Sequence, residues 1–154
     1  MFREIRRKDR MITNDEAIEI LKSNDYGVLS TTGENGYPYG VPISYVFFND
    51  AIYFHCASEG HKLDNISNNS KVSFCVVGQT NILPAKFSTE YESVIVFGEA
   101  IEVSNDEKYT ALLEIANKYS ANFIEEGKEY IQRSGNATKV MKINIEHISG
   151  KARR

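Results

Sequence analysis

The chain has no tryptophan, only three prolines and only two cysteines among its 154 residues. Cys56 and Cys75 lie among apolar residues typical of strands, and neither belongs to a Cys-x-x-Cys pair. The basic N-terminus has no apolar stretch of the kind found in a signal peptide, so we expect a cytoplasmic protein with two buried free thiols. No apolar run approaches the roughly 18 residues that a membrane helix needs, which predicts no membrane partner.

Positive charge is not in excess. The 18 Lys and Arg residues are outnumbered by 21 Asp and Glu residues, which gives a net charge of −3. General nucleic-acid binders usually carry a basic balance or a basic stripe. We therefore expect no nucleic-acid partner. With 42% apolar and 25% charged residues, the composition is that of an ordinary globular domain.

Apolar periodicity and turn residues divide the chain into alternating elements. Thr13 with Glu16, and Ser104 with Glu107, have the spacing of capping boxes. The pattern predicts helices over about 13–24, 61–68, 105–119 and 122–133, and strands over about 26–32, 37–48, 51–56, 71–77, 92–103 and 138–148. We expect a loop from Gly78 through Pro84.

Hairpin signals dominate the first two thirds of the chain. Asn49-Asp50 is a two-residue hairpin turn, and Pro42 lacks an N–H, which predicts an edge or bulged strand there. Antiparallel hairpins followed by late helices favour a mainly β, α+β domain over residues 1–154. The sequence therefore predicts a small β-barrel with peripheral helices.

The densest chemistry lies in the segment "YFHCASEGHKLDNI", residues 53–66. A metal site is disfavoured because His55 and Cys56 are adjacent and point to opposite faces of a strand. Cys56 with His61 could form a nucleophile and its base, but no third orienting group accompanies them. We predict no metal ligands.

A phosphate cradle is the stronger hypothesis for this segment. A strand ends in small residues and a helix begins at His61, so free N–H groups of the first turn would face an anion. Ser58 adds a hydroxyl, Gly60 allows close backbone approach, and Lys62 adds positive charge. The alternative is an ordinary strand end, with a solvated Lys62 and a strand histidine at His55.

Longer stretches resemble a known family. "GYPYGVPISYVFFNDAIYFHCASEGHKLDNISNNSKVSFCVVG", the later "YESVIVFGEAIEV" and the opening "RRKDR" resemble the Nim-type (5-nitroimidazole resistance protein-like) branch of the pyridoxamine 5'-phosphate oxidase-like flavoproteins. The resemblance covers roughly residues 5–148. It implies a six-stranded antiparallel split β-barrel that forms a homodimer with FMN at the interface. It also implies an oxidoreductase that reduces a small acceptor, such as a nitro-aromatic, with electrons from NADH or NADPH.

The resemblance also implies which residues meet the flavin. The strand segment 41–44 would pass along the ring, the strand end at 55–57 would lie beside the ring or ribityl chain, and a basic pair would hold the phosphate. His55 is the candidate for a catalytic role. The predicted cofactor-binding residues are Val41, Pro42, Ile43, Ser44, His55, Cys56, Ala57, Ser58, His61, Lys62 and Ser93.

Two departures argue against oxidation of pyridoxamine phosphate. Tyr39 stands where the oxidase proper has a basic residue, and the chain stops at Arg154, before a C-terminal substrate-binding section. The alternatives are a non-catalytic flavin-binding redox or stress protein, and a split barrel that binds haem or a deazaflavin. We expect the basic residues at 3–10 to form a solvated end, the alternative being an arm beside a phosphate.

Overall fold

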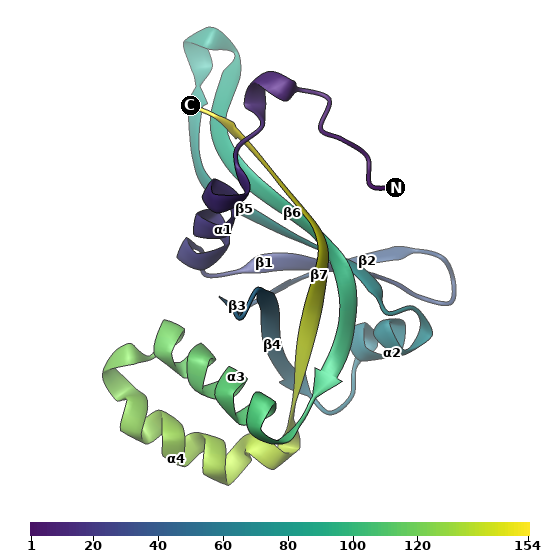
Figure 1. The fold of residues 1–154 in the computed structure, drawn as a ribbon, viewed down its shortest axis with the longest axis vertical. Helices are drawn as coiled ribbons and strands as arrows, with labels where there is room; N and C mark the ends of the chain where they lie inside the picture. Colours follow the sequence, from purple (N-terminus) through teal and green to yellow (C-terminus); the bar gives the residue numbers. More distant parts are fainter.

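The computed structural model describes all residues, 1–154. Its centre is one strongly curled antiparallel sheet of seven strands in the order β2-β1-β5-β6-β7-β4-β3 (Figure 1). The strands are β1 (Gly27–Thr32), β2 (Pro38–Ile43), β3 (Val46–Phe48), β4 (Ala51–Ala57), β5 (Lys71–Leu83), β6 (Ser88–Val103) and β7 (Thr138–Arg153).

Helices cover the sheet at its ends and edges. They are α1 (Asn14–Ser23), α2 (His61–Asn68), α3 (Asn105–Tyr119) and α4 (Ile124–Ser134), with short 3-10 turns η1 (Lys8–Arg10), η2 (Pro84–Lys86), η3 (Ala121–Phe123) and η4 (Gly135–Ala137). Figure 1 shows α3 and α4 side by side at one end of the molecule, and the β5–β6 hairpin extending at the other. No helix is both long enough and apolar enough to span a membrane.

The sheet is split because β2 and β3 occupy its two opposite edges, although they follow each other in the chain. Only Ser44 and Tyr45 connect them, so the edges come together at that corner without pairing. The mainly β split-barrel class is thereby confirmed. The sheet has seven strands rather than six because the predicted strand 37–48 is broken at this corner, and Pro42 lies on the edge strand β2 as expected.

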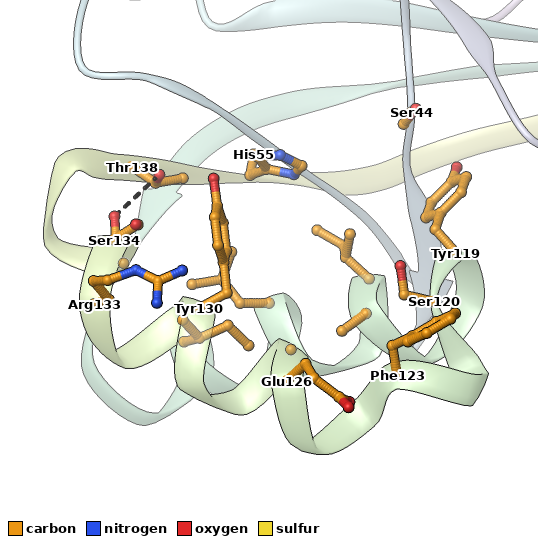
Figure 2. A pocket seen from close by; sticks show the side chains of 16 residues that line it. Ser44, His55, Tyr119, Ser120, Phe123, Glu126, Tyr130, Arg133, Ser134 and Thr138 are labelled. Atoms are coloured by element: carbon orange, nitrogen blue, oxygen red, sulfur yellow. Dashed lines mark hydrogen bonds between the residues drawn. The ribbon is translucent and has the colours of Figure 1, made fainter.

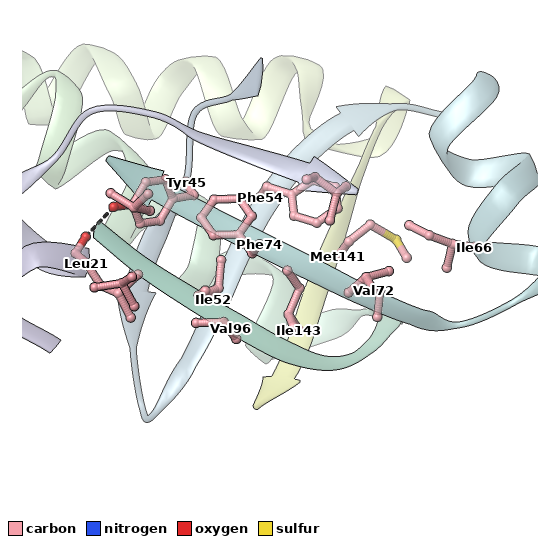
Figure 3. Packing of buried hydrophobic residues seen from close by; sticks show 14 of the residues in the cluster. Leu21, Tyr45, Ile52, Phe54, Ile66, Val72, Phe74, Val96, Met141 and Ile143 are labelled. Carbon is pink, nitrogen blue, oxygen red and sulfur yellow. Dashed lines mark hydrogen bonds between the residues drawn. The ribbon is translucent and has the colours of Figure 1, made fainter. Parts of the chain in front are cut away.

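The core lies inside the curl of the sheet. Strands β1, β5 and β6 alternate buried and less buried positions, which is the pattern of strands with one face against a core. Tyr45, Phe54 and Phe74 are fully buried there, and Figure 3 shows them side by side. The Tyr45 and Phe74 rings meet edge to face, with their centres 4.9 Å apart. Each large apolar side chain buried in this way contributes about 1.5–3 kcal/mol.

Contacts from two helices fix the β2–β3 corner. The Tyr45 hydroxyl donates to the carbonyl of Leu21 in α1. From α3, Lys118 Nζ donates to the Tyr45 carbonyl at 2.8 Å, and the Tyr45 N–H donates to the Tyr119 hydroxyl at 2.9 Å. The backbone between β2 and β3 is therefore held from both sides, and this corner forms part of the site below.

Two local predictions are wrong. The expected loop from Gly78 through Pro84 is mostly strand, because β5 and β6 stay paired up to Leu83 and Ser88. The expected cap at Ser104 does not form either. The Glu107 carboxylate instead accepts the Tyr53 hydroxyl at 2.6 Å and lies 3.1 Å from Lys142 Nζ, so long-range partners replace the local one.

Candidate cofactor-binding site

The end of β4 presents alternate side chains to opposite faces. His55 and Ala57 are exposed, whereas Cys56 is buried in the core cluster. Burial raises the pKa of the Cys56 thiol, so it stays protonated at neutral pH. Only the backbone of Cys56 can therefore meet a bound molecule, while the His55 ring is available from outside.

The start of α2 is open. Gly60 is the N-cap residue, at φ +152°, and no side chain caps the helix. The first helical bond runs from the Asp64 N–H to the Gly60 carbonyl at 3.0 Å, which leaves the N–H groups of the first turn without a partner in the chain. Ser58 is exposed beside this turn. Such a helix start attracts anions because the helix dipole points its positive end there.

Lys62 and His61 lie at this helix start but differ in their surroundings. Lys62 is half-buried. Its charge helps to lower the pKa of His55, and it offsets part of the rise in the pKa of Cys56 that burial causes. His61 is exposed, and its ring stacks on Tyr39 with the ring centres 3.9 Å apart. Lys62 is thus the cation best placed between the helix start and the strand end. Tyr39, which departs from the oxidase pattern, supports His61.

The predicted ring-binding segment 41–44 lies on an edge strand. Val41 and Ile43 pack against the core, whereas Pro42 and Ser44 are exposed. Because β2 pairs only with β1, half of its backbone N–H and C=O groups point away from the sheet with no strand beside them. These groups are free to meet the polar edge of a planar ligand.

A pocket of about 690 Å³ separates the strand end from the last two helices. Figure 2 shows His55 projecting from β4 on one side, and Tyr130 and Arg133 from α4 on the other. Ser44 of the β2–β3 corner lines the same pocket, so the fold brings two of the predicted residues together. Loss of water around the ring, with help from the Lys62 charge, lowers the pKa of His55. Its imidazole is therefore neutral at pH 7.

The helical wall of this pocket was not predicted. Phe123 and Tyr130 look like helix-packing residues in the sequence, but they are 62% and 61% exposed and line the cavity. Leu112, Ile115 and Ile131 add apolar surface. The sequence shows apolar residues on α4, but only the structure shows that the helix buries none of them fully.

Ser93 lies apart from the other predicted residues. It is half-buried on the outer face of β6, opposite Lys151 of β7. Because β7 separates β6 from β4, Ser93 is not beside the strand end of its own chain. Ser44 and His55 line one pocket, and the Tyr39–His61 stack joins β2 to the start of α2.

Comparisons with known structures agree with this architecture. A candidate 5-nitroimidazole antibiotic resistance protein from Bacteroides thetaiotaomicron is 22% identical, with 92% of this chain and 86% of that chain covered and a TM-score of 0.74. A FAD-binding protein from Mesorhizobium loti is 21% identical over 94% and 98% of the two chains, with a TM-score of 0.66. A FAD and heme binding protein from Mycobacterium smegmatis is 16% identical over 91% and 71%, with a TM-score of 0.80.

No curated protein matches the chain. The family model described as pyridoxamine 5'-phosphate oxidase matches residues 13–152, which include every strand but the last residue of β7 and every α-helix. A match of this extent assigns the family, and it agrees with the split barrel seen in the structure. The chain belongs to the pyridoxamine 5'-phosphate oxidase family.

Proposed function

We propose that the protein binds FMN and acts as an oxidoreductase that passes electrons from NADH or NADPH to a small acceptor, such as a nitro-aromatic. One observation carries the proposal: the uncapped start of α2, with half-buried Lys62, lies next to an edge strand whose backbone groups are free. A flavin mononucleotide needs both features, an anion site and a polar edge for its ring.

Each part of the chain has a task in this arrangement. The N–H groups at the start of α2, the Ser58 hydroxyl and the Lys62 ammonium would hold the phosphate. The edge of β2 over 41–44 would orient the ring, and the neutral His55 imidazole would lie beside it. When bound, FMN supplies hydride acceptance from the nicotinamide and its delivery to the acceptor. No side chain has to transfer a proton for hydride transfer itself, so His55 acts by position.

A second copy of the chain would complete the flavin site. The outer face of β5 and β6 exposes Val77, Ile95 and Phe97 at 55%, 41% and 39%, a group of apolar side chains that water disfavours. Ser93 lies on the same face of β6, two residues before Ile95. If two copies pack these faces together, Ser93 of one chain can approach the cradle of the other. Analytical ultracentrifugation tests this: we expect the wild type to sediment as a dimer and Phe97→Asp as a monomer.

The visible spectrum tests FMN binding directly. The protein purified with added FMN should retain the two absorption bands of an oxidised flavin after gel filtration, and NADH or NADPH should bleach them under anaerobic conditions. A flavin that stays bound but is not bleached would point to the non-catalytic redox or stress protein. A protein that never retains FMN would contradict the proposal.

Haem is a second candidate, because the His55 side chain lines the 690 Å³ pocket. A neutral imidazole nitrogen commonly binds haem iron, and apolar side chains with one arginine would suit a ring that carries carboxylates. Here Leu112, Ile115 and Ile131 supply the apolar wall and Arg133 the cation. Haem titration into wild type should produce a Soret band. His55→Ala should lose it, whereas Lys62→Ala should keep it; an unchanged band in His55→Ala would remove this candidate.

A further inference from the structure

The end of the sheet away from α3 and α4 carries a group of cations on one face of β6 and β7. Tyr91 and Ser93 of β6 lie opposite Arg153 and Lys151 of β7, respectively. Residues directly opposite each other on antiparallel strands project to the same face. Two hydroxyls and two cations therefore share a small area of the outer face.

The N-terminal segment adds a third cation to this group. Gly150 has no side chain, and a Cβ there would lie 2.6 Å from Ile12, so the glycine lets the segment rest on β7. The Ile12 N–H donates to the Gly150 carbonyl at 3.2 Å, and Met11 bridges to Lys151. Figure 1 shows the segment running beside the end of β7.

This docking places Arg10 over Tyr91. One guanidinium nitrogen of Arg10 donates to the Tyr91 hydroxyl at 3.4 Å, and the guanidinium carbon is 5.9 Å from the ring centre. The hydrogen bond from Arg10, assisted by the charges of Lys151 and Arg10, lowers the pKa of Tyr91. The hydroxyl accepts from Arg10, so its own proton remains available for an incoming oxygen atom.

No carboxylate forms an ion pair with these cations, because the carboxylates nearby have other partners. Arg10, Lys151 and Arg153 are half-buried and form no ion pair. The nearby Asp9 is held by Arg7, with bonds of 2.8 and 2.6 Å. Glu90 and Glu92 alternate with Tyr91 along β6, and each has another partner: Asn81 donates to Glu90 at 2.8 Å, and Arg154 lies 3.8 Å from Glu92. Like charges gathered without ion-pair partners of their own disfavour the folded state, and a bound anion would relieve that repulsion.

We propose that Arg10, Tyr91, Ser93, Lys151 and Arg153 form a binding site for the phosphate group of a nucleotide. A phosphate ester carries about −1.5 to −2 charges and several acceptor oxygens. A ligand with a phosphate group therefore matches three cations and two hydroxyls better than a ligand with a single carboxylate would. The site is distinct from the start of α2. Lys151 lies thirteen residues along β7 from Thr138, the partner of Ala57, which is roughly 40 Å of strand. One phosphate group cannot serve both places in one chain, and the proposal does not depend on FMN binding at α2.

The test uses the full chain, free of cofactor and labelled for NMR. Titration with inorganic pyrophosphate should give saturable shifts of the backbone amides of Arg10, Tyr91, Ser93 and Lys151. Arg10→Gln and Lys151→Gln should each weaken pyrophosphate binding by about tenfold or more, the usual effect of losing a hydrogen bond to a charged group. Tyr91→Phe removes only the hydroxyl and should weaken binding by about two- to tenfold.

Arg6→Gln is the matched control, because Arg6 is an exposed arginine of the same segment. It removes the same charge and should leave pyrophosphate affinity unchanged. Thermal unfolding of each variant shows whether it is folded. Shifts that do not saturate, or equal affinity in the wild type, Arg10→Gln and Lys151→Gln, would overturn the proposal.

Two further probes identify the source of the phosphate. If FMN displaces pyrophosphate and Arg10→Gln weakens FMN, the group belongs to a flavin, reached from a second copy of the chain. If adenosine 2',5'-bisphosphate displaces pyrophosphate and FMN does not, the group belongs to a nicotinamide dinucleotide phosphate. Both outcomes support a phosphate site, and failure of FMN to bind at α2 would leave either one intact.

Discussion

The first two helices of the chain begin in opposite ways. At the start of α1, the Thr13 hydroxyl accepts the Glu16 N–H at 3.2 Å, and the Glu16 carboxylate accepts the Thr13 N–H at 2.9 Å. At the start of α2, Gly60 offers no side chain, and the first N–H groups have no partner in the chain. One helix start is closed by its own residues, and the other is open.

Stability does not explain why the start of α2 is left uncapped. A glycine N-cap is only a few tenths of a kcal/mol worse than Ser or Thr, so the chain loses little by leaving α2 uncapped. What it gains is a set of N–H groups with half-buried Lys62 beside them. Such a start can accept an external anion, whereas α1 has already used its donors.

Replacing Lys62 tests the open start and has the largest expected effect. Lys62→Ala should weaken FMN binding by about 1.5–3 kcal/mol, the contribution of a hydrogen bond to a charged group. Fluorescence titration of FMN measures it, because bound flavin changes its emission. Lys71→Ala, at an exposed position at the start of β5, is the control and should bind FMN as the wild type does. Equal losses in both variants would mean that only overall charge matters.

Gly60→Ala changes the start of α2 through the backbone conformation of its N-cap residue. At φ +152° and ψ 172° an alanine is strained, and the cost is about 1–3 kcal/mol. Urea unfolding should show this loss, together with weaker FMN binding. Gly36→Ala, at φ +80° in the β1–β2 turn, should also lose stability but keep its FMN affinity. If Gly60→Ala kept full affinity, the geometry of the α2 start would be irrelevant to the cofactor.

Thr13→Ala removes the cap of α1 and should lower stability without changing FMN affinity. Loss of the cap should lower the free energy of unfolding by about 1 kcal/mol, as measured by urea denaturation. FMN affinity should not change, since α1 lies away from the cradle. Thr13→Ser, which keeps the hydroxyl, should recover most of the stability. A fall in FMN affinity without a fall in stability would show that the two helix starts do not have separate roles.

Local patterns explain which parts of this structure could be predicted from the sequence. The capping box at Thr13 and the turn at Asn49-Asp50, where both residues have positive φ, depend on neighbours in the chain, and both are confirmed. The Ser104 cap has the same spacing but fails because Glu107 binds Tyr53 of a strand far away in sequence. Local spacing cannot reveal such a competitor.

The candidate site likewise has features that the local sequence predicts and features that only the tertiary fold creates. Strand alternation correctly separates His55 from Cys56, and the bounds of α2 place Lys62 in its first turn. The pocket beside His55 could not be predicted, because it exists only where α3 and α4 fold back against the end of β4. The position of Arg10 on Tyr91 likewise requires the register of β6 and β7 and the bare backbone at Gly150.

The smallest expected effect is the pH dependence of the closed start. The Thr13 N–H, with help from the Thr13 hydroxyl and Arg154, holds the pKa of Glu16 below its usual range. A carboxyl whose pKa is lower in the folded state stabilises the protein above its unfolded pKa of about 4.5 and loses that contribution as the pH falls through the folded value. Between pH 7 and pH 3, the free energy of unfolding should therefore decrease less steeply for Glu16→Gln than for the wild type, as measured by urea denaturation at each pH. The cap of α2 contains no such carboxylate. If Glu16→Gln left the pH dependence of the free energy of unfolding unchanged, the acid sensitivity would come from other residues, and the contrast between the two helix starts would be weaker.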